Sequence, residues 1–121
     1  MSKKILIVDD AVFHRLKCSN LLKEQGYRIL EASDGMEAIR QFKEKSPDLV
    51  LMDITMPELD GISALKKIME ISPFANVVMF TAQGQQALIS QALSLGAKDY
   101  LLKPTSNEKL LALVTRILGE P

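Results

Sequence analysis

Five polar side chains stand where short apolar runs end: the pair Asp9 and Asp10, and Asp53, Thr81 and Lys103. If these runs are buried parallel strands of one sheet, the five groups meet at its carboxyl edge, where open parallel sheets bind their ligands. Carboxylates suit a hard cation, and an ammonium and a hydroxyl suit the oxygens of a phosphoryl group. The placement therefore predicts a site for phosphoryl chemistry that uses a divalent cation.

Three carboxylates at one sheet edge repel one another, and burial raises their pKa values unless a cation neutralises them. We expect Mg²⁺, which prefers oxygen ligands. Asp10 and Asp53 are the expected direct ligands, Asp9 is expected to act through a bound water, and the backbone carbonyl of Thr55 is the expected third protein oxygen. The sequence has no Cys/His cluster, which disfavours zinc.

A carboxylate at such a site can act as a nucleophile and form an acyl phosphate. The ammonium of Lys103 and the hydroxyl of Thr81 are then placed to stabilise the phosphoryl oxygens. Residues 9–12 read Asp-Asp-Ala-Val, so the first strand is not followed by a glycine-rich phosphate loop. This argues against a P-loop NTPase, a mononucleotide site and a flavin module of the same architecture.

Length and composition predict one globular domain over residues 1–121. Lysines plus arginines and aspartates plus glutamates number 15 each, so a zero net charge gives no electrostatic footprint for nucleic acid or an acidic membrane. The single cysteine, Cys18, excludes an internal disulfide and favours a reducing cytoplasm. No apolar stretch approaches the ~20 residues of a membrane span.

Short apolar runs alternate with longer helical patterns, which is typical of βαβ units. The expected strands are residues 4–8, 28–32, 49–52, 76–80 and 99–102. The expected helices are residues 12–25, 35–45, 61–71 and 84–95 and a last helix that Asn107 could cap, ending near residue 118.

The first, third and fourth strands are apolar throughout, as strands are when helices cover both sheet faces. The second strand carries Arg28 and Glu31, and the fifth is flanked by Lys98 and Asp99, so these two are expected at the edges. The order 2-1-3-4-5 satisfies this and predicts a doubly wound, flavodoxin-like α/β fold with five helices.

Four segments carry a resemblance to a known family: ILIVDD at 5–10, MDITMPELDG at 52–61, Thr81-Ala82, and GAKDYLLKP at 96–104. In this order and spacing they resemble the receiver domain of two-component response regulators, most closely the single-domain chemotaxis regulators. The resemblance covers essentially the whole chain.

The resemblance implies a phosphorylation-activated switch in which Asp53 accepts a phosphoryl group from a histidine kinase with Mg²⁺ required, and which catalyses only its own phosphorylation and dephosphorylation. It implies that Thr81 moves toward the phosphoryl group, that Tyr100 swings inward behind it, and that the Lys103–Pro104 bond is cis. The fourth helix, fifth strand and fifth helix would form the output face. With no output domain after residue 121, the target would be another protein, in chemotaxis a flagellar motor switch protein.

Some positions depart from the family or vary within it. Thr55 and Gln83 lie two residues after Asp53 and Thr81, at positions that influence the lifetime of the phosphoryl group, and Thr105 stands where many chemotaxis members have an aromatic residue.

Other functions remain in competition. A phosphorelay carrier, passing its phosphoryl group to another histidine protein, would form a complex centred on the first helix. An aspartyl phosphohydrolase needs an acid two residues after its nucleophile, where Thr55 stands. His14 is expected to be an ordinary polar residue near the surface, although it could line the mouth of the site. Cys18 is expected to be a packed or half-exposed thiol without a charged partner.

Overall fold

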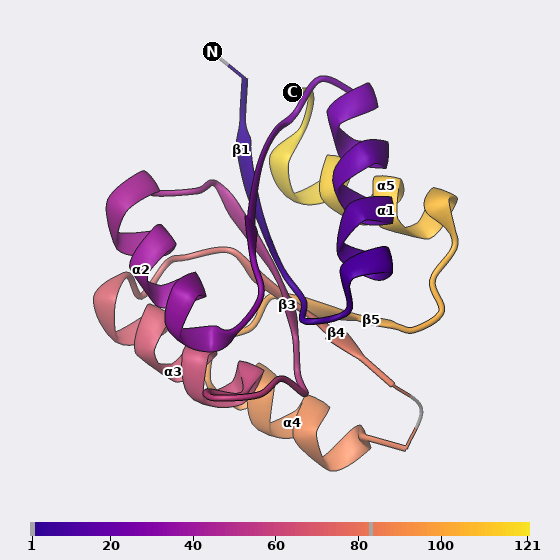
Figure 1. The fold of residues 1–121 in the computed structure, drawn as a ribbon. Helices are drawn as coiled ribbons and strands as arrows, with labels where there is room; N and C mark the ends of the chain where they lie inside the picture. Colours follow the sequence, from indigo (N-terminus) through magenta and orange to yellow (C-terminus); the bar gives the residue numbers. More distant parts are fainter. Residues whose placement is uncertain (1, 83) are drawn as a thin grey trace.

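The computed structural model describes residues 2–82 and 84–121, in which strands and helices alternate along the chain (Figure 1). The strands are β1 (Lys4–Val8), β2 (Arg28–Ala32), β3 (Leu49–Asp53), β4 (Val77–Thr81) and β5 (Asp99–Leu102). The helices are α1 (Val12–Glu24), α2 (Gly35–Lys45), α3 (Gly61–Ile71), α4 (Gln86–Ser94) and α5 (Asn107–Leu118).

The strands form one parallel sheet in the order β2-β1-β3-β4-β5. This confirms the predicted order and the edge positions of the two charged strands. The register pairs Val8 with Met52 and Asp53 with Phe80, so β1, β3 and β4 end close to one level. The loops that leave these ends therefore gather at one edge of the sheet.

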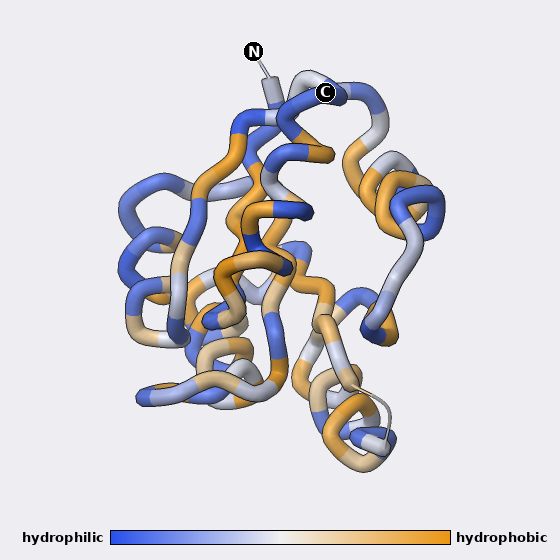
Figure 2. The backbone as a smooth tube through the Cα atoms, turned by 45° about the vertical axis from the view of Figure 1, so that its right-hand side comes forward, coloured by the Kyte–Doolittle hydropathy of each residue, from blue (hydrophilic) through white to orange (hydrophobic). Residues whose placement is uncertain are grey.

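Alternating residues of the central strands supply two separate hydrophobic cores. On one face, Leu6 and Met52 pack with buried residues of α2 and α3. On the other, Ile7 and Phe80 pack with buried residues of α1 and α5. Figure 1 shows α1 and α5 together on one side of the sheet and α2, α3 and α4 on the other, and in Figure 2 the strands between them are mostly hydrophobic.

Element ends differ from the predictions by small amounts. β3 includes Asp53, and β4 begins one residue later than expected. α4 is shorter than residues 84–95. The cap of α5 was assigned wrongly: the hydroxyl of Ser106 accepts the hydrogen bond from the backbone N–H of Lys109, and Asn107 is the first helical residue.

Two further observations concern the whole chain. Among the described residues, no helix combines the length and apolar character needed to cross a bilayer. Gln83, one of the two positions expected to influence phosphoryl lifetime, lies outside the described residues.

Candidate phosphoacceptor site

The predicted carboxylates meet at the carboxyl edge of the sheet. Asp53 is the last residue of β3, and Asp9 and Asp10 follow β1 directly. One oxygen of each of the three can be chosen so that all lie within 4.8 Å of one another. Asp9 and Asp53 are buried and Asp10 is exposed. The cluster therefore opens to solvent on the side of Asp10, which would let a cation and a phosphodonor enter.

Tight backbone packing holds the end of β3 in place. The N–H of Gly61, at the start of α3, donates to the carbonyl of Ile54 at 2.8 Å, and the N–H of Ile54 donates to the carbonyl of Phe80 on β4 at 3.1 Å. A Cβ on Gly61 would overlap the carbonyl oxygen of Asp53. Because only glycine lets α3 come so close, Gly61 sets where the Asp53 carboxylate sits.

Lys103 reaches the carboxylates from the end of the edge strand β5, which β4 separates from β3. Its Nζ lies 2.9 Å from Oδ2 of Asp9 and 3.4 Å from Oδ2 of Asp53. The bond between Lys103 and Pro104 is cis, as expected from the resemblance. The ammonium thus bridges two carboxylates that would otherwise repel each other.

His14 contacts this cluster, which agrees with the alternative that it lines the site and not with an ordinary surface residue. Its Nδ1 hydrogen-bonds Oδ2 of Asp9, its Nε2 lies 3.8 Å from Sγ of Cys18, and its ring packs edge-on against Phe80. Cys18 is buried, as a packed thiol was expected to be, and the His14 ring is its polar neighbour. The only signal in the sequence was that His14 lies one helical turn after Asp10.

These contacts set the charge states of the metal-free site. Burial raises the pKa of Asp9, but hydrogen bonds from His14, the Ala11 N–H and Lys103 outweigh burial and lower this pKa to about 2. The hydrogen bond to Asp9 raises the pKa of His14 to about 9. Burial, together with the charges of Asp9 and Asp10, raises the pKa of Asp53 against the opposing effect of Lys103. Burial therefore disfavours the charged form of Asp53, whereas hydrogen-bond donors hold Asp9 in its charged form.

Thr81 lies at the end of β4 and is fully buried, and the hydrogen-bond acceptors of its hydroxyl are the Ala82 carbonyl and the Gln85 amide oxygen, not a carboxylate. The Thr81 hydroxyl donates to Oε1 of Gln85 at 2.9 Å, and the N–H of Ala82 donates to the same oxygen at 2.7 Å. Nε2 of Gln85 donates to the hydroxyl of Thr55 at 2.9 Å. Gln85 thus connects two predicted site residues, a role that no pattern in the sequence indicated.

Tyr100, the predicted switch residue, lies on β5 with 42% of its surface exposed. Leu102, two residues along the same strand, is 47% exposed. The predicted output face of α4, β5 and α5 therefore presents apolar and aromatic side chains to solvent, with Tyr100 outward in this state.

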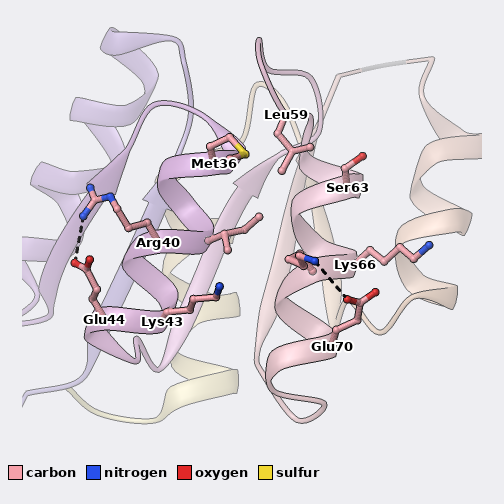
Figure 3. A pocket seen from close by; sticks show the side chains of 10 residues that line it. Met36, Arg40, Lys43, Glu44, Leu59, Ser63, Lys66 and Glu70 are labelled. Carbon is pink, nitrogen blue, oxygen red and sulfur yellow. Dashed lines mark hydrogen bonds and ion pairs between the residues drawn. The ribbon is translucent and has the colours of Figure 1, made fainter.

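A groove between α2 and α3 lies away from this edge (Figure 3). Met36, Ile39 and Leu59 provide apolar lining, and the ion pairs Arg40–Glu44 and Lys67–Glu70 lie along its sides. Its charged groups are mostly paired along the helices, and it brings no group of the carboxylate cluster within reach. We therefore place the chemistry at the sheet edge.

Comparison with known proteins identifies the class to which this fold and site belong. Residues 5–115 match the response regulator receiver domain, so the chain belongs to that family of two-component systems. It is 44% identical to the chemotaxis protein CheY of Bacillus subtilis over 120 residues, 98% of this chain and 100% of that protein. It is also 46% identical over 117 residues to the protein CcdB of the same organism, covering 96% of this chain and 98% of that one.

A solved structure has the same fold as this chain. The crystal structure of the CheX–CheY–BeF₃–Mg²⁺ complex from Borrelia burgdorferi contains a chain that matches with a TM-score of 0.89 and 37% identity. The match covers 95% of this chain and 88% of that chain. The predicted flavodoxin-like receiver fold is thereby confirmed.

Proposed function

We propose that this protein is a phosphorylation-activated signalling switch in which Asp53 accepts a phosphoryl group from the phosphohistidine of a histidine kinase. The observation that carries the proposal is the cluster of Asp9, Asp10 and Asp53 with Lys103 at the edge of the sheet. A carboxylate oxygen of Asp53 forms the new O–P bond. The N–P bond of the donor breaks, and its electron pair stays on the donor imidazole.

The donor set fits Mg²⁺. The cluster consists of carboxylate oxygens, and the pKa of Asp53 is raised, first by burial and then by the charges of Asp9 and Asp10, which a bound cation would offset. Asp10 and Asp53 would be direct ligands together with the carbonyl of Thr55. Both oxygens of Asp9 already accept hydrogen bonds from the protein, which supports a ligand role for Asp9 through water. When bound, the cation would neutralise the phosphoryl oxygens.

Side chains of this protein would bind the phosphoryl oxygens and respond to them. Lys103 would hold a phosphoryl oxygen by charge, and the Thr81 hydroxyl would donate to another after leaving Gln85. Tyr100 would then turn inward from its exposed position. With Thr55 two residues after Asp53, no acid stands there to serve a general phosphohydrolase, so the protein would catalyse only its own phosphorylation and dephosphorylation.

We place this switch in the cytoplasm and in chemotaxis, with a flagellar motor switch protein as target on the α4-β5-α5 face. The support is the high similarity to chemotaxis proteins named CheY and the exposed Tyr100 and Leu102.

A second candidate, a phosphorelay carrier, is favoured by one observation. Phe13, at the start of α1 beside the site, is 91% exposed, and Leu16 is 43% exposed. A histidine phosphotransfer protein would dock on this surface. Phe13→Ser should then block phosphoryl transfer to that protein, whereas Tyr100→Ser should not. The reverse result would favour the chemotaxis target.

The direct test of the proposed function is incubation with acetyl phosphate, with and without Mg²⁺, followed by intact mass measurement. We expect a Mg²⁺-dependent gain of one phosphoryl group that Asp53→Asn abolishes and that Asp99→Asn, at a half-buried position outside the carboxylate cluster, preserves. Labelling of Asp53→Asn at the wild-type level would remove Asp53 from its role.

A further inference from the structure

Gln85 is the N-cap residue of α4. It precedes α4, yet its side chain makes no capping hydrogen bond to the helix. At such positions a side-chain oxygen ordinarily accepts a hydrogen bond from the first turn. Here the amide instead turns back toward β4, and each end of the amide group makes hydrogen bonds within the phosphoacceptor site. The Gln85 side chain therefore stabilises the phosphoacceptor site and not the start of α4.

The two donors that Gln85 occupies are those which a phosphoryl oxygen would need. The Ala82 N–H donates to Oε1 of Gln85 at 2.7 Å. The Thr81 hydroxyl lies 2.9 Å from the same oxygen and 3.1 Å from the carbonyl oxygen of Ala82, the other acceptor for its single proton. They leave the end of β4, which pairs with the end of β3 that carries Asp53. The Gln85 amide oxygen thus accepts hydrogen bonds from the groups that we expect to donate to a phosphoryl oxygen. It occupies those donors as a phosphoryl oxygen would, but without a net charge.

We propose that Gln85 is a resting-state latch: its amide oxygen occupies the Thr81 and Ala82 donors until a phosphoryl group on Asp53 displaces it. The inference rests on the proposed function and adds to it a competitor carried by the chain itself. The latch lowers the apparent affinity of the site for a phosphoryl group, because only the fraction of molecules with Gln85 displaced can bind it fully.

The position of Gln85 also gives the displacement a route to the output face. Its backbone carbonyl accepts hydrogen bonds from the N–H groups of Leu88 and Ile89 in the first turn of α4. Release of the side chain from Thr81 and Thr55 therefore frees the residue on which α4 begins. Phosphorylation is thereby coupled to the helix that forms part of the predicted output face.

The test compares two substitutions of Gln85. If Gln85 had only a structural role, both would change the affinity for beryllofluoride in the same direction. Gln85→Ala removes the competing oxygen, and we expect beryllofluoride in the presence of Mg²⁺ to bind about two- to tenfold more tightly, the range expected for loss of one net hydrogen bond. Gln85→Glu keeps both acceptor bonds, strengthens them by charge and repels the anion, so its affinity should fall below wild type. Acetyl phosphate labelling rates should follow the same order.

Gln86→Ala is the matched control, since Gln86 is the adjacent, exposed residue at the first position of α4. It should bind beryllofluoride as wild type does. Thermal melts of all variants identify any loss of folding. Equal or weaker binding by a folded Gln85→Ala would overturn the latch while labelling of wild type at Asp53 still stands. Absence of labelling in wild type would overturn the proposed function and the latch together.

Discussion

The ammonium nitrogen of Lys103 lies 2.9 Å from Oδ2 of Asp9, a residue 94 positions earlier in the chain. The same oxygen also takes the hydrogen bond of the His14 imidazole. Two cationic groups therefore converge on one buried carboxylate, while Asp53 shares only the lysine, at 3.4 Å. Asp53 therefore has fewer charge-compensating partners than Asp9.

Loss of the lysine should expose the repulsion between Asp9 and Asp53. We expect Lys103→Ala to lower the free energy of unfolding of the metal-free protein by on the order of 2 kcal/mol, because two buried carboxylates lose their common partner. Mg²⁺ should bind and restore more stability in this variant than in wild type, although beryllofluoride should no longer move Tyr100. Urea titrations with and without Mg²⁺ measure the first effect and tyrosine fluorescence the second. Lys66→Ala, at an exposed lysine on α3, is the control. A wild-type response of Lys103→Ala to beryllofluoride would make the lysine a purely structural residue.

Mg²⁺ alone should raise the melting temperature. A ligand of the folded state stabilises it by linkage, by about 1.4 kcal/mol when the free cation is at roughly ten times its dissociation constant. For a domain of this size that corresponds to a shift on the order of 5 °C. Asp10→Asn, which removes the exposed ligand carboxylate, should reduce the shift strongly. An unchanged melting temperature of wild type at millimolar Mg²⁺, measured by circular dichroism, would contradict the metal site.

The His14 imidazole should make the metal-free protein less stable as pH rises. The pKa of His14 is about 9 in the folded state against 6.5 for the free side chain. Between these values the folded state binds the extra proton, so this stabilisation is complete below pH 6.5 and is lost as the pH rises through about 9. Its size should be on the order of 2 kcal/mol. The titratable groups that face the His14 ring are Asp9, Lys103 and Cys18. They are the same in wild type and in the variant used for the measurement.

The measurement is chemical unfolding in EDTA at several pH values between 6 and 10 for wild type and His14→Gln. The difference in stability between the two proteins should shrink across that interval. A difference that stays constant with pH would mean that the hydrogen bond to Asp9 carries no proton linkage.

Ser19 offers a prediction about stability alone. Within the described residues, its hydroxyl oxygen is buried without a hydrogen-bond partner. Burial of an unpaired hydroxyl is unfavourable, and alanine is the better helix former, so Ser19→Ala should stabilise the protein by about 1 kcal/mol. Urea unfolding measures this directly. Destabilisation by Ser19→Ala would mean that the hydroxyl has a partner, such as a buried water.

Sequence reasoning located the parts of the site that strand ends determine. Asp9, Asp10, Asp53, Thr81 and Lys103 were assigned because an apolar run predicts a buried strand, and the end of a parallel strand fixes where the next side chain begins. The five-strand order followed from which strands carry charge.

Sequence reasoning did not locate the parts that depend on side-chain direction. His14 lies on a helix whose polar and apolar residues are poorly separated, so no periodicity indicated that its ring turns toward Asp9. Gln85 lies in a connecting segment, where hydrogen bonds rather than burial select the conformation. The cap of α5 was missed by one position because Ser106 and Asn107 are both suitable caps, and only the backbone geometry decides between them.

Gly61 carries a consequence for how freely this sequence can vary. The start of α3 presses on the carbonyl of Asp53 so closely that the site tolerates no side chain there. In a saturation library at position 61 selected for phosphorylation, we expect glycine to be recovered almost alone, whereas position 84, where a Cβ would meet no neighbour, should be limited only by its positive φ. The position of the reactive carboxylate thus requires a residue without a side chain eight positions later, whatever residue stands at position 53.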